Sequence, residues 1–213
     1  MGLNDHRLED PFFDEQGDTN ITMRNLPHWS QDGKIYFVTW RLADSLPQEL
    51  LAQLAVDRKA WVRLHGDKLL DALDLQLKQE WYRLFHHRVQ EWLDAGHGSC
   101  VLRHSEVLRI MVDTLRHFDG QRYILGSFAI AGNHVHLLAE PLAGHGIPDI
   151  LHSWKSYSAN AINRALKSKG RLWMDEYFDR LIRDLNHLRR VEDYLAAHVH
   201  QGAHVQCHDL LGN

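Results

Sequence analysis

The stretch Ile130-Ala131-Gly132-Asn133-His134-Val135-His136-Leu137-Leu138 places two histidines one residue apart in an apolar segment. Successive side chains of a β-strand point to opposite faces, so a strand here carries both imidazoles on one face and Val135 on the other. Two imidazoles on one face suit a divalent metal ion and leave positions open for further ligands and for substrate oxygens. The alternative interpretation is a half-buried strand with two solvent-facing histidines.

The segments around this strand predict an α+β fold. Strands are expected over 34–42, 122–131 and 134–140, the last two joined by a tight turn at Gly132-Asn133. Helices are expected from Pro47, after Ser105, over 150–166 and over 184–200, whereas 172–178 is ambiguous between strand and loop. This order predicts a ferredoxin-like split βαβ core with an antiparallel sheet, a helical insertion over about 58–95 and a C-terminal catalytic helix.

Length and composition predict one folded domain. A chain of 213 residues with 44% hydrophobic content can bury a full core, and we expect that domain over 31–213 after an irregular N-terminal arm over 1–30. No apolar run approaches the length of a membrane span, and the first residues are too polar for a signal peptide. We therefore expect a cytoplasmic protein without membrane contact, and the two cysteines, Cys100 and Cys207, fit a reducing compartment.

A tyrosine and a histidine in the last predicted helix form a second candidate group. Tyr194 and His198 are four residues apart, so they lie one above the other on one helix face. If this helix packs over His134 and His136, the site contains three imidazoles and a phenol. A phenol with a pKa near 10 is a poor nucleophile at neutral pH, and a metal-polarised phosphate or a base compensates for this. The alternative is an ordinary amphipathic helix with a half-buried tyrosine and a surface histidine.

Charge is unevenly distributed along the chain. The formal net charge is -4, yet 154–190 holds nine Lys and Arg against four Asp and Glu, a balance of +5. This segment predicts a local basic surface, although solvated helix faces produce the same pattern.

Seven segments give the chain a more specific signature, and they are Arg24–Trp29, Tyr36–Pro47, Phe118–Tyr123, Asn133–His136, His152–Tyr157, Ile162–Asn163 and Tyr177–Arg183. In this order they closely resemble the REP-associated tyrosine transposases, relatives of the small insertion-sequence transposases in the HUH, single-tyrosine superfamily. The resemblance covers roughly residues 24 to 200.

The resemblance implies a metal-dependent single-stranded DNA endonuclease and strand transferase. In that family the strand histidines bind Mg²⁺ or Mn²⁺, and a tyrosine of a late helix attacks DNA beside a hairpin to form a phosphotyrosine. His134 and His136 match the first element and Tyr194 matches the tyrosine. The relatives carry Asn or Gln where this chain has His198, and an imidazole there keeps a ligand while favouring Mn²⁺ or softer ions. The family's Met-Pro before Asn-His is Ala131-Gly132 here.

The partner that the resemblance implies is single-stranded DNA with REP-like hairpins. The resemblance is also compatible with a homodimer of this chain. Cations, an amide and an aromatic ring are the groups that grip phosphates and stack unpaired bases. The candidate DNA-binding residues are Lys155, Asn163, Arg164, Trp173, Arg180 and Arg183.

Other interpretations remain open. Tyr157 and Tyr177 are rival nucleophiles, but neither has a ligand-type residue four positions later, and we assign Tyr157 to packing or base contact. A histidine-triad nucleotide hydrolase requires a third strand histidine where this chain has Leu138. A domesticated hairpin-binding protein, with the fold kept and catalysis lost, is the non-enzymatic alternative.

Overall fold

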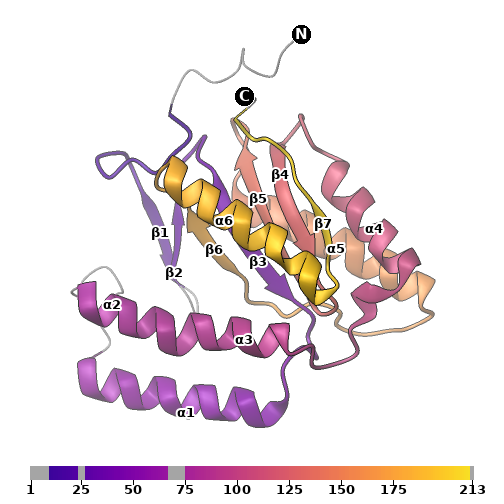
Figure 1. Cartoon of the computed structure of the whole chain (residues 1–213), viewed down its shortest axis with the longest axis horizontal. Coiled ribbons are helices and arrows are strands. Elements are labelled where there is room, and N and C mark those ends of the chain that lie inside the picture. The colour runs from indigo at the N-terminus through magenta and orange to yellow at the C-terminus, as the bar shows by residue number, and fades with distance from the viewer. Residues whose placement is uncertain (1–9, 24–26, 67–74, 212–213) are drawn as a thin grey trace.

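The computed structural model describes residues 10–23, 27–66 and 75–211 and has an α+β fold around an antiparallel sheet (Figure 1). The sheet has five strands in the order β6-β3-β5-β4-β7. Their bounds are β3 Tyr36–Arg41, β4 Tyr123–Ile130, β5 His134–Pro141, β6 Phe178–Leu181 and β7 His204–Gln206. The α+β class, the antiparallel sheet and the C-terminal helix agree with the sequence-based prediction.

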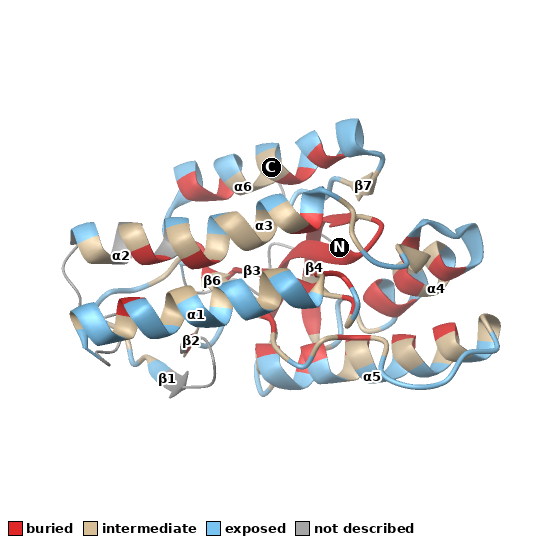
Figure 2. Ribbon diagram, turned by 90° about the horizontal axis from the view of Figure 1, so that it is seen from below, coloured by how far each residue is buried: buried red, intermediate tan, exposed pale blue. Residues whose placement is uncertain are grey.

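Helices cover both faces of the sheet (Figures 1 and 2). Helices α4 (Ser105–Arg116) and α5 (Ile147–Ala165) lie on one face, where Val38, Val135 and Leu137 join their buried residues in the larger core. Helix α6 (Leu185–Ala197) crosses the other face and packs Leu188 and Leu195 against strand residues. Successive side chains of β3 and β5 therefore enter opposite cores, as expected for strands that are buried on both faces.

The helical insertion lies at one end of the sheet, where α1 runs alongside α2 and α3 (Figure 1). Its helices are α1 Gln48–His65, α2 Leu75–Trp81, a π-helical turn Tyr82–His87 and α3 Arg88–Asp94. Trp61, Trp81 and Phe85 form a small core of their own, and Arg88 binds Asp57 at 2.6 Å. Helix α1 begins directly after its N-cap Pro47, where the sequence predicts the start of a helix.

Three segments differ from the prediction. The N-terminal segment was expected to be irregular, but β1 (Asn20–Met23) and β2 (Pro27–Ser30) pair as antiparallel strands. Backbone hydrogen bonds stabilise this pair, and the periodicity of the sequence does not reveal them. The ambiguous segment contributes β6, which starts at Phe178, and β7 is a short edge strand that the sequence pattern missed. Residues 1–9 of the expected arm and 24–26 of the first motif lie outside the described residues.

Within the described ranges, no helix combines the length and the apolar character that crossing a membrane demands.

A buried histidine joins the β1–β2 hairpin to the sheet edge. His28 Nδ1 lies 2.7 Å from Asp179 Oδ1, and His28 Nε2 lies 3.3 Å from Glu176 Oε1. The imidazole also lies over the ring of Tyr177, with 4.3 Å between ring centroids. Burial alone would lower the pKa of His28, but the hydrogen bonds to Asp179 and Glu176 outweigh it and raise the pKa to about 9.

This ion pair predicts a pH-dependent stability. The stabilisation from protonated His28 should be fully present below about pH 6.5 and lost as the pH rises through about 9, because the folded state holds the proton more tightly. Urea denaturation across this range should show a steeper fall in the free energy of unfolding for the parent than for His28→Gln. Parallel curves for the two proteins would contradict the assignment.

Candidate metal centre

Strand β5 directs His134 and His136 toward the face that α6 covers. The two residues are 1% and 0% exposed, while Val135 and Leu137 enter the core on the opposite face. Across the sheet, His136 is paired with Thr39 of β3 on one side and with Ala129 of β4 on the other. The shared face is therefore confirmed, and the interpretation of two solvent-facing histidines is wrong.

Helix α6 brings a tyrosine and the third histidine to the same face. The helix begins after Asp184, whose carboxylate accepts the backbone N–H of His187 at 2.7 Å, and it ends at Ala197. His198 opens a 3₁₀ turn, His198–Gln201, instead of continuing the helix as predicted. It still faces the sheet and is 1% exposed, so it is not a surface histidine. The Tyr194 hydroxyl lies 3.3 Å from His136 Nε2.

The three histidines form a compact cluster. One nitrogen each from His134, His136 and His198 lies within 4.8 Å of the others. His134 Nδ1 donates to the Asn133 side-chain oxygen at 2.7 Å, and His198 Nδ1 donates to the Tyr194 carbonyl at 2.8 Å. Because both partners are acceptors, Nε2 carries the lone pair in the neutral form of each ring.

Those two Nε2 atoms are buried and have no hydrogen-bond partner among the described residues. An unpartnered buried acceptor costs free energy, and a divalent cation between the rings satisfies both at once. The donor set fits a transition metal ion, for which imidazole is a common ligand.

Neighbouring residues orient the strand imidazoles. Thr39 Oγ1 lies 2.7 Å from His136 Nδ1, and the Asn133 amide also donates to the His97 carbonyl at 2.9 Å. Such partners fix the ring orientation and the tautomer of metal-binding histidines. The sequence does not reveal this role of Thr39 and Asn133, because the pairing of Thr39 with His136 depends on sheet register.

Burial sets the protonation states of the site. It lowers the pKa of His134 to about 3 and that of His136 well below its ordinary value, with nearby histidines adding to the effect. Both rings are therefore neutral at physiological pH, which is the form that binds a metal ion. Burial also raises the pKa of Tyr194, and the carboxylate of Asp94 adds to the rise. The phenol is consequently protonated and needs activation.

Asp94, the last residue of α3, is a site residue that the sequence analysis missed. Its Oδ1 lies 3.6 Å from His134 Nε2 and 3.9 Å from His198 Nε2. Burial raises the pKa of this carboxyl group. A lone aspartate at a helix end carries no motif, so only the folding of the insertion against the sheet brings it to the site.

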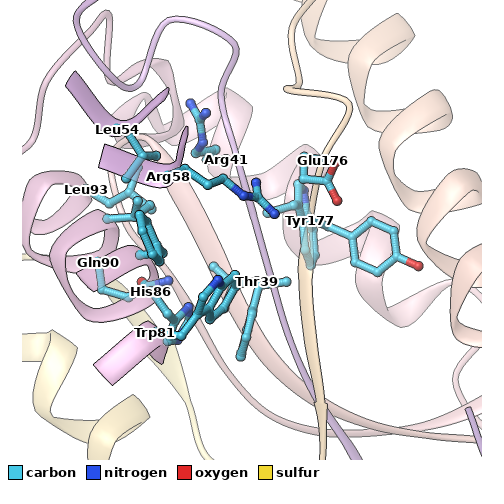
Figure 3. A pocket seen from close by; sticks show the side chains of 14 residues that line it. Thr39, Arg41, Leu54, Arg58, Trp81, His86, Gln90, Leu93, Glu176 and Tyr177 are labelled. Carbon is cyan, nitrogen blue, oxygen red and sulfur yellow. The ribbon is translucent and has the colours of Figure 1, made fainter. Parts of the chain in front are cut away.

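A cavity of about 150 Å³ lies between β3, the segment 176–178 and the helical insertion (Figure 3). Thr39, Arg41 and His86 line it together with Trp81 and Leu93. The ring of His86 stacks on that of Phe178, with 3.8 Å between the ring centroids.

The candidate DNA-binding residues divide into two groups. Lys155 donates to the carbonyls of Met174 and Asp175 at 2.6 and 2.9 Å, and the amide of Asn163 donates to the Gly170 carbonyl.

Trp173 is 4% exposed, and its Nε1 donates to Ser158. Trp173 is thus a core residue, and its buried ring is not available to stack on unpaired bases. Arg164 and Arg183 are exposed, and Arg180 is half-buried on β6.

The rival tyrosines lie in other surroundings. Tyr157 is 63% exposed on α5, where its ring is stacked with His117, and Tyr177 is buried against His28. Tyr194 is the tyrosine that hydrogen-bonds the histidine cluster.

Comparison with known proteins bears on the segment that contains this site. Residues 105–198, from α4 to His198, match the family model described as Y1_Tnp, "Transposase IS200 like". The resemblance to insertion-sequence transposases is thereby confirmed for this segment. No curated protein matches the chain.

Two solved structures are similar at low identity. The structure of a REP-associated tyrosine transposase bound to a REP hairpin has 12% identity and a TM-score of 0.46, over 84% of this chain and 75% of that chain. A protein from Deinococcus radiodurans R1, provisionally classed as a transposase, has 16% identity and a TM-score of 0.40, over 76% of this chain and 88% of that one.

The hydrogen bond from Thr39 predicts a measurable effect on metal affinity. Thr39→Val keeps the branched shape but removes the oxygen that orients His136, so the affinity for Mn²⁺ should fall about 10- to 100-fold. Isothermal titration calorimetry with MnCl₂ measures this directly. Thr39→Ser keeps the hydroxyl and should bind nearly as tightly as the parent. An unchanged dissociation constant in Thr39→Val would refute the role.

Proposed function

We propose that this protein is a metal-dependent single-stranded DNA endonuclease and strand transferase acting at REP-like hairpins through a phosphotyrosine intermediate. The observation that carries the proposal is the Tyr194 hydroxyl, 3.3 Å from His136 Nε2 at the edge of the cluster of His134, His136 and His198. A nucleophile and a candidate metal site therefore meet at one point within a single chain.

The fold supports this proposal. The segment β3-α4-β4-β5-α5-β6, with the spatial order β6-β3-β5-β4, agrees with a ferredoxin-like split βαβ core. The match to the IS200-like family spans both strand histidines, Tyr194 and His198. Because fold alone does not define activity, the proposal rests mainly on the residues of the site.

His134, His136 and His198 would hold a divalent ion, Mg²⁺ or Mn²⁺, which when bound would supply charge stabilisation to a phosphodiester oxygen. Helix α6 presents the Tyr194 oxygen for attack on phosphorus. As the oxygen–phosphorus bond forms, the bond from phosphorus to a sugar oxygen breaks. The phenol releases one proton and the leaving oxygen takes one up, so the step balances.

A tyrosine nucleophile suits strand transfer better than hydrolysis. The phosphotyrosine ester keeps the bond energy of the cleaved phosphodiester, so a new DNA end can be joined without ATP. Neutral His134 and His136 remain available as ligands across the physiological pH range because burial lowers their pKa values.

Covalent attachment tests the proposal. A labelled single-stranded REP-like hairpin, incubated with the parent and Mn²⁺, should give a protein–DNA adduct that survives denaturing electrophoresis. Tyr194→Phe removes only the hydroxyl, so the adduct should disappear while folding and hairpin binding persist. Tyr157→Phe is the matched control and should form adduct normally.

An adduct that persists in Tyr194→Phe but vanishes in Tyr157→Phe would move the nucleophile to α5. Hairpin binding by the parent without adduct, across several hairpins and metals, would favour the domesticated hairpin-binding protein.

The exposed arginines of the basic segment predict a salt-dependent affinity. The double substitution Arg164→Ala and Arg183→Ala should weaken hairpin binding, because a protein that neutralises fewer phosphates releases fewer counterions. The slope of log K against log salt should become shallower by about 0.7 to 0.9 for each phosphate that the variant no longer neutralises. Fluorescence anisotropy at several salt concentrations measures it.

The exposed Arg109 of α4 lies outside the basic segment, so Arg109→Ala is the control. An identical slope in the double variant and the parent would show that these arginines do not bind phosphate.

A further inference from the structure

We propose that Asp94, contributed by the helical insertion, is a fourth protein ligand of the metal centre. The inference rests on the proposed function insofar as it assumes that the cluster of His134, His136 and His198 binds a metal ion.

The geometry shows acceptors converging on one point. A single oxygen, Asp94 Oδ1, lies 3.6 Å from His134 Nε2 and 3.9 Å from His198 Nε2. Both nitrogens are buried acceptors without a hydrogen-bond partner in the described part of the chain. Lone pairs on oxygen and nitrogen repel one another unless a metal ion or a proton lies between them. Adjacent ligand atoms about 2.1 Å from an octahedral ion are about 3.0 Å apart, so modest side-chain rotations bring this oxygen into range and leave positions open for substrate.

The position of Asp94 is fixed by contacts on both sides. The preceding residue, Leu93, is 2% exposed, and the Asp94 carboxylate hydrogen-bonds the side chain of Gln201 in the turn that His198 opens. Asn133 reinforces the arrangement, because its oxygen accepts from His134 and its amide donates to the carbonyl of His97, three residues after Asp94. One side chain therefore ties the end of the insertion to the histidine strand.

The fourth ligand adds a negative charge to a set of three imidazoles. Three imidazoles and one carboxylate form an imidazole-rich ligand set, which suits Mn²⁺ and later transition metals. Mg²⁺ prefers oxygen ligands and retains several waters. The insertion thus becomes part of the metal centre, in which the three imidazoles favour Mn²⁺ over Mg²⁺ and Asp94 adds a negative charge that strengthens cation binding.

Metal titration with Mn²⁺ alone tests the ligand role without relying on activity. Asp94→Ala and the isosteric Asp94→Asn should each weaken Mn²⁺ binding at least about tenfold. Losing a residue that only orients a metal ligand already costs about that much, and losing a ligand should cost no less. The visible absorption spectrum of bound Co²⁺ should also change, because it reports the number and type of ligands. Glu91→Gln removes an exposed carboxylate from the same helix and is the matched control.

Unchanged Mn²⁺ affinity and an unchanged Co²⁺ spectrum in both Asp94 variants would overturn the inference, whether or not the parent forms adduct. An equal loss in Glu91→Gln would also overturn it, because general electrostatics would then explain the effect. A parent that shows the Asp94-dependent affinity but no adduct would support this inference and refute the proposed activity.

Discussion

Imidazoles buried inside a sheet need hydrogen-bond partners, and this constraint organises the site. Asn133 and the Tyr194 carbonyl each accept from an Nδ1, and Thr39 pairs with the third ring. These bonds offset much of the cost of burial and leave the Nε2 atoms directed at one another. Adjacent strands and α6 must therefore pack in the observed register for the cluster to exist.

Asn133 has a second structural role, because it lies where three parts of the fold meet. Its backbone carbonyl accepts from Leu42, its side-chain oxygen accepts from His134, and its amide reaches His97. The β4–β5 hairpin, the end of β3 and the end of the insertion are thus held together at one residue. This junction explains how helices remote in sequence from the histidine strand come to lie beside it.

The half-buried phenol of Tyr194 poses an opposite electrostatic problem to the histidines. Burial keeps His134 and His136 neutral and ready to bind a cation, but it also favours the protonated form of Tyr194. A cation at the cluster would bind to the neutral histidines, and it would also favour the deprotonated form of Tyr194. The same low-dielectric surroundings thus suit metal-assisted attack and disfavour a free phenolate.

The sequence by itself determined the strand pair around Gly132-Asn133, the shared face of His134 and His136, and the four-residue spacing of Tyr194 and His198, because periodicity in strands and helices is local. It also predicted the α+β class. Only the tertiary structure decided that α6 brings Tyr194 to His136, that Trp173 belongs to the core and that Thr39 and Asp94 adjoin the site. Those contacts join residues far apart in the chain, and no local pattern encodes the register and packing that bring them together.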